Sequence, residues 1–143
     1  MILVDANILI YAFNSDSLHH RVADRWLNAR LSEDQRVGLP WPVLLAVLRV
    51  VTNPRAMTQP IAMSTARAQV RHWLESPAVW CPAPGDRHMR ILDDLLALPG
   101  IQGNLVTDAH LAALAIEHGL EVCSADSDFA RFPGVRWRNP LTD

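Results

Sequence analysis

The stretch Met1-Ile2-Leu3-Val4-Asp5-Ala6-Asn7 opens the chain and decides how the rest is interpreted. Its residues Ile2, Leu3 and Val4 are apolar and β-prone, which is typical of a parallel strand buried on both faces. Asp5 follows directly at the carboxyl end of that strand. The stretch therefore predicts a buried strand whose end carries a carboxylate.

Strand and helix patterns alternate along the rest of the chain. The expected strands are residues 2–4, 37–39, 79–81, 121–124 and 135–138. The expected helices are residues 7–13, 19–31, a segment opened by Pro40 and Pro42 that runs to Val51, and residues 62–75, 87–98 and 108–118. This alternation predicts the α/β class, with a mainly parallel sheet covered by helices on both faces.

The last of these helices has clear boundary residues. Thr107 is expected as its N-cap, Asp108 lies in the first turn, where a negative charge is favourable, and Gly119 is expected at its end. Between them, leucine and alanine recur with helical spacing. The pattern predicts a helix that begins at a carboxylate.

Composition limits the class of protein. The 143 residues suffice for one compact domain, so residues 1–143 are expected to form a single unit. Half of them are hydrophobic and 20% are charged, which is typical of a globular domain rather than a disordered segment. The net charge of -2 excludes a strongly basic protein, so any nucleic-acid site must be local.

The same sequence indicates a cytoplasmic protein with no membrane segment. Cys81 and Cys123 are too far apart and too few for a disulfide framework or a zinc site. The apolar N-terminus is interrupted by Asp5 and has no preceding basic region, unlike a signal peptide. Arg49 interrupts the richest apolar run, residues 41–51, so no segment is long enough to span a bilayer.

Four aspartates occupy positions that differ from those of the other acidic residues. Asp5 and Asp126 follow expected strands, Asp128 stands two residues further on, and Asp108 opens the helix described above. Strand ends and the starts of following helices share one edge of a parallel sheet, so the four side chains are expected to converge. Taken singly, Asp108 also suits a helix start and Asp126 and Asp128 suit a turn.

Converging carboxylates repel one another unless a proton or a cation intervenes. Oxygen ligands without cysteine or paired histidine favour Mg²⁺ or Mn²⁺ over zinc. Such a site is suited to phosphodiester hydrolysis, because the metal activates water and stabilises charge on the phosphate. The remaining acidic residues, among them Asp24, Glu33, Asp34, Glu75 and Glu117, are expected to be solvated.

Several segments together resemble a known family. They are Ile2-Leu3-Val4-Asp5-Ala6-Asn7, residues 103–115 (GNLVTDAHLAALA), 124–132 (SADSDFARF), 48–55 (LRVVTNPR) and 137–141 (WRNPL). On these residues the chain resembles the PIN domain and, within it, the VapC toxins. The segments span nearly the whole sequence, which makes the resemblance specific as a set.

The resemblance implies a three-layer α/β/α PIN fold and an endoribonuclease toxin of a type II toxin–antitoxin system. It further implies dependence on Mg²⁺ or Mn²⁺, cleavage of a structured RNA such as tRNA or rRNA, a homodimer, and neutralisation by a VapB-type antitoxin. Carried over residue by residue, it gives Asp5, Asp108 and Asp126 as metal ligands, Asp128 as a supporting catalytic acid, and Asn7 and Ser124 as groups that orient the ligands.

The sequence departs from the family at one point. Family members commonly carry a glutamate ahead of the residue that corresponds to Arg49, whereas the segment around Ala46 contains no acid. Loss of that carboxylate is expected to weaken a second metal most. It leaves open an alternative function, a catalytically weakened PIN module that binds RNA or a partner protein without cleavage.

Two further expectations concern RNA and an unrelated chemistry. The candidates for RNA contact are Arg49 and Arg55 and, beside them, Arg87, Arg90, Arg131 and Arg138. Trp26, Trp41 and Trp73 are expected in the core or in dimer contacts rather than as platforms for base stacking, because they fall on apolar helix faces. A phosphatase of the haloacid-dehalogenase type also places an aspartate after its first strand. It needs a second aspartate two residues later, where this chain has Asn7, so the phosphatase is disfavoured.

Overall fold

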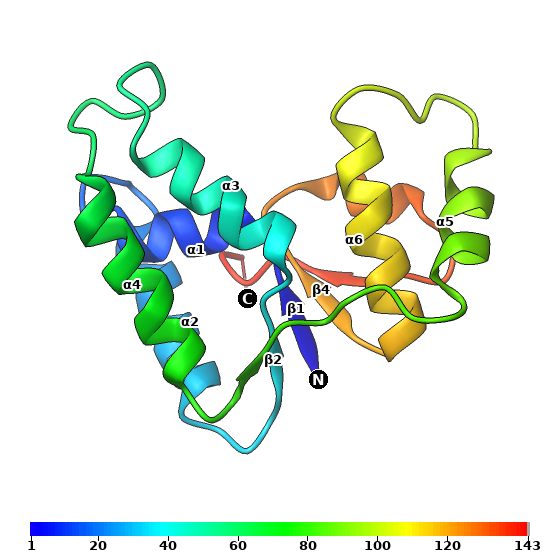
Figure 1. The fold of residues 1–143 in the computed structure, drawn as a ribbon, viewed down its shortest axis with the longest axis horizontal. Helices are drawn as coiled ribbons and strands as arrows, with labels where there is room; N and C mark the ends of the chain where they lie inside the picture. The colour runs from blue at the N-terminus through cyan, green and yellow to red at the C-terminus, as the bar shows by residue number, and fades with distance from the viewer. Residues whose placement is uncertain (143) are drawn as a thin grey trace.

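A parallel β-sheet forms the middle layer of the structure, a computed structural model that describes residues 1–142 (Figure 1). Its strand order is β3-β2-β1-β4-β5, and every neighbouring pair is parallel. The strands are β1 (Ile2–Val4), β2 (Val37–Gly38), β3 (Val79–Trp80), β4 (Glu121–Cys123) and β5 (Arg136–Arg138). The first residues of the chain thus form the central strand.

Helices cover both faces of this sheet. They are α1 (Ala6–Phe13), α2 (His20–Leu31), α3 (Trp41–Val51), α4 (Met63–Glu75), α5 (His88–Leu96) and α6 (Leu105–His118), with a 3-10 helix, η1 (Ser127–Arg131). Figure 1 shows α1 to α4 on one side and α5 and α6 on the other. The expected three-layer α/β/α architecture is confirmed.

Strand β1 is the point at which the order of the strands reverses. From β1 the chain moves through β2 to β3 on one side, and then returns to β4 and β5 on the other. Leu3 pairs with Gly38 of β2, and Val4 pairs with Cys123 of β4, so the carboxyl ends of these three strands are level. In an open α/β sheet this edge is where ligands bind.

Burial explains why β1 is central. Ile2, Leu3 and Val4 are all buried, as expected for a strand with helices on both faces. The core continues through α6, where Leu111 and Leu114 are also buried. Apolar side chains therefore hold the strand that ends at Asp5.

Helix α6 begins three residues earlier than the sequence predicted. Asn104, not Thr107, is the N-cap, because a turn at Gly103 with a φ of 58° reverses the chain just ahead of it. Asp108 still lies in the first turn, and Gly119 ends the helix with a φ of 70°. The expectation for Thr107 is wrong, whereas those for Asp108 and Gly119 are confirmed.

The expectation that Glu117 is solvated is also wrong. Only 6% of its side chain is exposed, and its carboxylate accepts hydrogen bonds from the backbone N–H groups of Gly85 at 2.8 Å and Arg87 at 2.9 Å. The Gly85 N–H is the main cause that lowers the pKa of Glu117. These bonds fasten the start of α5 to the end of α6.

The tryptophans differ from one another in burial. Trp73 is buried and Trp26 is partly buried against the core, in line with expectation. Trp41 is instead 51% exposed at the first position of α3, so a core role is wrong for this residue. Helical spacing placed it on the apolar face, but at the first position of α3 no neighbouring element covers half of its surface.

No helix within residues 1–142 is both long enough and apolar enough to cross a membrane.

The burial of α6 generates a stability prediction. Leu114→Ala should lower the free energy of unfolding by about 2–5 kcal/mol, because it leaves a cavity among fully buried side chains. Leu18→Ala, which truncates a side chain that is 99% exposed, is the matched control and should change it by less than about 0.5 kcal/mol. Urea denaturation measures both, and equal midpoints for the two variants would contradict this packing.

Candidate active site

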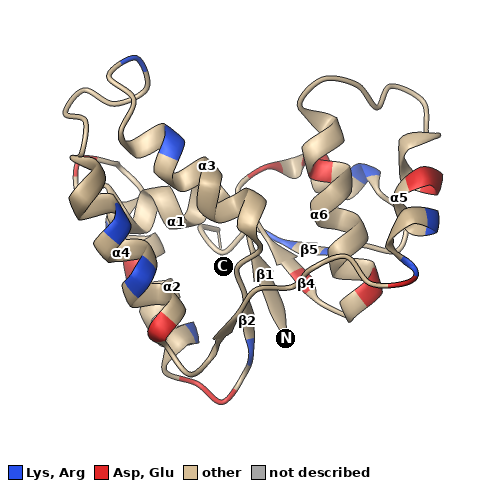
Figure 2. Ribbon diagram, in the orientation of Figure 1, with Lys and Arg blue, Asp and Glu red and all other residues tan. Residues whose placement is uncertain are grey.

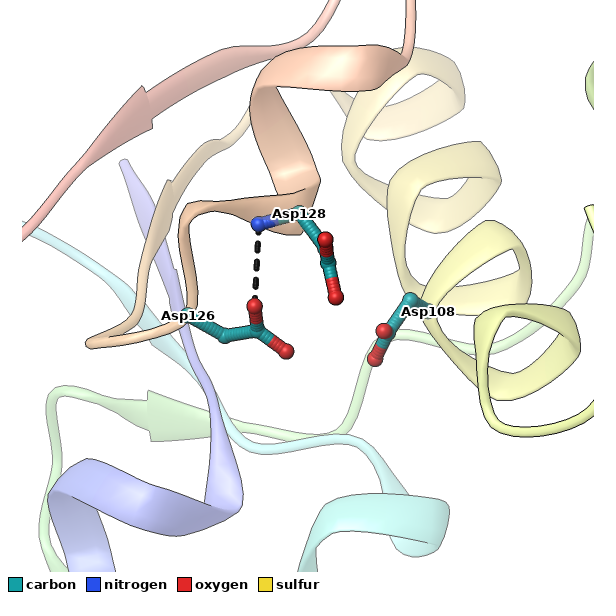
Figure 3. Close-up of side chains that lie close together, drawn as sticks. All are labelled: Asp108, Asp126 and Asp128. Atoms are coloured by element: carbon teal, nitrogen blue, oxygen red, sulfur yellow. Dashed lines mark hydrogen bonds between the residues drawn. The ribbon is translucent and has the colours of Figure 1, made fainter. Parts of the chain in front are cut away.

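Three carboxylates from separate parts of the chain meet at the carboxyl edge of the sheet (Figure 3). Asp108 comes from the first turn of α6, Asp126 from the loop after β4, and Asp128 from η1. Each offers an oxygen, and these oxygens all lie within 4.8 Å of one another. Distant residues therefore form one cluster, as the strand ends predicted.

The loop after β4 is shaped by one of these carboxylates. Asp126 is the N-cap of η1, and its Oδ1 accepts a hydrogen bond from the Asp128 N–H at 2.9 Å. Figure 3 shows the two side chains on the same side of this turn, opposite Asp108. Asp126 thus shapes the turn and belongs to the cluster, so these two interpretations of the residue are compatible.

Asp5 lies beside this cluster and is held by its neighbours. Its Oδ1 accepts from the Ala6 N–H at 2.7 Å, and its Oδ2 accepts from Ser124 Oγ at 2.7 Å and Asn7 Nδ2 at 3.3 Å. The side chain is fixed in one orientation because both oxygens have partners. Asn7 and Ser124, the two residues expected to orient the ligands, thus both contact Asp5, which was expected as a ligand.

Ser124 links Asp5 to both Asn7 and the loop after β4. Its buried hydroxyl donates to Asp5 and accepts from Asn7 Nδ2 at 3.1 Å and from the Asp126 N–H at 3.0 Å. Asn7 Oδ1 in turn accepts from the Ala125 N–H at 3.2 Å. Ser124 and Asn7 therefore join the end of β1 to the loop that presents Asp126.

The charges of the four aspartates act on one another. Burial raises the pKa of Asp108 to about 6, with further contributions from the charges of Asp5, Asp126 and Asp128. Burial also raises the pKa of Asp5, an effect that the Ser124 hydrogen bond opposes and the charge of Asp126 reinforces. The site concentrates negative charge that a cation would neutralise.

The three clustered aspartates differ by one residue from the set of metal ligands that was expected. Sequence reasoning gave Asp5, Asp108 and Asp126 as ligands and Asp128 as a supporting acid, whereas the three clustered oxygens belong to Asp108, Asp126 and Asp128. Asp5 lies on the inner side of the cluster with both oxygens engaged. A donor set made only of carboxylates suits Mg²⁺ or Mn²⁺ better than zinc.

Arg131 contacts the cluster and was not assigned to it from the sequence. Its Nε donates to Asp128 Oδ1 at 3.2 Å, which leaves the second oxygen of Asp128 available. The spacing of three residues between them, on a short helix, is the signal that indicates this contact. Arg131 therefore offsets part of the negative charge and fixes Asp128.

Arg49 and Arg55, two of the arginines proposed for RNA contact, make no ion pair with the clustered acids among the described residues. Arg49 is exposed in the last turn of α3, and Arg55 is exposed in the turn that follows. Helix α3 carries no carboxylate, and Figure 2 shows no acidic residue along it. The acid missing around Ala46 is therefore not replaced from within this helix.

The chain is similar to proteins of known family over almost its full length. The PIN domain family matches residues 2–135. The chain is 46% identical to ribonuclease VapC37 of Mycobacterium tuberculosis over 140 residues, covering 98% of this chain and 97% of the relative. It is 38% identical to ribonuclease VapC33 of the same species over 143 residues, covering 100% of both.

Solved structures share the fold at lower identity. VapBC2 from Rickettsia felis, bound to a DNA fragment from its promoter, has a TM-score of 0.70 at 18% identity and covers 97% of this chain and 98% of the neighbour. Mycobacterium tuberculosis VapC20, a sarcin-ricin loop cleaving toxin, has a TM-score of 0.68 at 21% identity and covers 95% and 99%. These likenesses show the same fold.

The raised pKa of Asp108 generates a prediction about pH. Its folded value of about 6 lies above the ordinary 3.8, so ionisation destabilises the folded state as pH rises through this range. In EDTA at pH 7.5, Asp108→Asn should therefore raise stability by on the order of 1 kcal/mol after solvent screening, or about 3 °C in Tm. Near pH 3.5 the gain should vanish, because the native carboxyl is then protonated.

Thermal unfolding followed by circular dichroism at both pH values provides the measurement. Asp94→Asn, at an exposed site on α5, is the matched control and should leave Tm unchanged at both. A gain of the same size at pH 3.5 and pH 7.5 would mean that charge repulsion is not its cause.

Proposed function

Because this chain belongs to the PIN-domain family and, within it, to the VapC ribonucleases, we propose that it acts as a divalent-metal-dependent endoribonuclease toxin on structured RNA. The observation that carries the proposal is the group of Asp108, Asp126 and Asp128, whose oxygens lie within 4.8 Å of one another. A cluster of this kind suits Mg²⁺, with Mn²⁺ as a substitute.

The donor chemistry supports this choice of metal. The clustered side chains are all carboxylates, and burial, reinforced by the charges of the neighbouring aspartates, raises the pKa of Asp108. When bound, a divalent cation supplies positive charge that activates water and stabilises the charge developing on the phosphate. Asp108, Asp126 and Asp128 would hold this ion, with Asp5 as the fourth acid of the site.

The remaining polar residues set the geometry for that chemistry. Ser124 and Asn7 hold Asp5 in one orientation, and Arg131 holds one oxygen of Asp128. Groups fixed in this way need little rearrangement when substrate binds, which lowers the barrier to reaction. Ser124 and Asn7 are thus positioning residues in this proposal.

A second candidate function rests on the acid-free helix α3. Without a carboxylate near Ala46, one ion is expected to bind firmly and a second only weakly. A site weakened further would bind RNA or a partner protein without cleaving it. Metal binding and RNA cleavage, measured separately, distinguish the two candidates.

The proposed partners follow from the relatives. VapC20 is described as cleaving the sarcin-ricin loop, which supports a structured RNA, either tRNA or rRNA, as the substrate class of this chain. VapBC2 of Rickettsia felis was solved as a toxin–antitoxin complex, which supports a VapB-type antitoxin as its inhibitor. A homodimer in the cytoplasm is the assembly that we propose with them.

Cleavage is tested by brief induction in bacteria followed by sequencing of RNA ends. The wild-type chain should generate new 5′ ends at a defined position in a structured RNA and arrest growth. Asp5→Asn should lower both effects by at least roughly 100-fold, because it removes a charge from the site. Asp94→Asn, exposed on α5, should behave as wild type, and a fully active Asp5→Asn would contradict the proposal.

Metal binding is tested by calorimetric titration with Mn²⁺. The wild-type chain should bind one ion with measurable heat, and Asp126→Asn should weaken this binding by about 10- to 100-fold because it removes the negative charge of one of the three clustered carboxylates. Asp93→Asn, at an exposed position on α5, is the control. If the wild-type chain showed no heat, the non-cleaving module would be the better description.

A further inference from the structure

An exposed stripe runs along α3 and has no partner among residues 1–142. Trp41 is 51% exposed, Leu45 is 57% exposed, and Arg49 is also exposed. Four residues separate each from the next, so the three share one face of the helix over about 12 Å. We call Trp41, Leu45 and Arg49 the α3 stripe.

The stripe begins at the edge of the sheet that carries the acidic cluster. Leu3 of β1 pairs with Gly38 of β2, so in the same parallel register Asp5 is level with Pro40. Trp41 is the next residue and the first of α3, which follows strand β2, a neighbour of β1 at the usual strand spacing of about 4.8 Å. Figure 1 shows α3 starting beside the end of β1.

The backbone around the indole is rigid. Pro40 is the N-cap of α3 with a φ of -70°, and Pro42 lies in the first turn. The following residues Val43 and Leu44 are buried and anchor the helix. A tryptophan in this setting has only two side-chain torsions to fix on binding, so it presents a large apolar surface at low entropic cost.

The charge of the stripe is suited to phosphate. Helix α3 contains no carboxylate, and Arg49 makes no ion pair among the described residues. Aromatic rings that stack on bases, combined with cations that contact the backbone, form the usual platform for single-stranded nucleic acid. The stripe combines both along one line that leads to the acids.

We propose that the α3 stripe binds an unpaired segment of the RNA substrate, with a base stacked on Trp41 and a phosphate at Arg49. The proposal rests on the ribonuclease function given above and adds the subsite that leads the strand to the cluster. It assigns to an exposed tryptophan the role of holding an unstacked base.

A second copy of the chain is the competing occupant of this face. A stable protein interface buries about 800 Å² on each partner. The stripe offers two apolar side chains and a cation, and other exposed large apolar residues, such as Leu18 and Met89, lie on other parts of the structure. This area matches a nucleotide better than a complete protein interface.

The test uses fluorescence anisotropy with a fluorescein-labelled oligoadenylate in EDTA, so that binding is read without cleavage. Trp41→Ala should weaken binding by roughly 5- to 100-fold, whereas Trp41→Phe should retain most of it, because a ring still stacks. Met89→Ala, which truncates a residue that is exposed on α5, is the matched control and should bind as wild type.

A salt titration tests the other end of the stripe. Arg49→Ala should reduce the slope of log affinity against log salt by about 0.7, the value for one phosphate contact in a single strand. Arg71→Ala, at an exposed site on α4, should leave the slope unchanged. An unchanged slope for Arg49→Ala would remove the phosphate contact from the proposal.

Four outcomes decide the proposal. Weaker binding by Trp41→Ala at unchanged sedimentation supports it, and equal binding by Trp41→Ala and wild type overturns it. If Trp41→Ala converts a dimer to a monomer and regains full affinity at high protein concentration, the α3 stripe is an interface with a second copy. This outcome also overturns the proposal. No oligoadenylate binding by the wild-type chain also overturns it.

Failure of the ribonuclease function gives a different result. The wild-type chain would then bind the oligoadenylate through Trp41, yet cleave no RNA when Mg²⁺ or Mn²⁺ is supplied. That result would support RNA binding at the α3 stripe and contradict the proposed ribonuclease activity.

Discussion

The hydrogen bond from Ser124 Oγ to Asp5 Oδ2, 2.7 Å long, fixes the relation between the two strands that build the site. Asp5 ends β1 and Ser124 follows β4, so this bond joins adjacent strand ends at the edge where ligands bind. The same hydroxyl accepts from the Asp126 N–H, so the loop that carries the clustered acids starts from a fixed point. The buried Ser124 hydroxyl therefore fixes both Asp5 and the loop that carries Asp126 relative to the core strands.

Burial of apolar side chains stabilises the folded state, whereas the crowded aspartates at the edge of the sheet destabilise it. Buried side chains of β1 and α6 stabilise the sheet, while burial of Asp108 and the charges of the neighbouring aspartates raise the pKa of Asp108. Folding is what forces the acids together, so the core stabilises an arrangement that is unfavourable without a cation. Such conflict is common at functional sites, where local stability is lower than the fold alone would allow.

The sequence was informative where local pattern and topology agree. Burial of β1 and convergence of Asp5, Asp108 and Asp126 followed from alternating elements and from the shared edge of a parallel sheet. Three features depend on tertiary neighbours and were missed: the earlier start of α6 at Leu105, the burial of Glu117 by the loop before α5, and the exposure of Trp41. Helical spacing gives the face of a residue, but not whether another element covers it.

Asp5 and Ser124 lie 119 positions apart in the chain, and their contact has a consequence for biosynthesis. Central strand β1 is synthesised well before β4 and the loop that carries Asp126. Contacts between such distant residues form late, because a long loop must close before they are made. A nascent or truncated chain that lacks β4 and the loop after it therefore has no assembled acidic site.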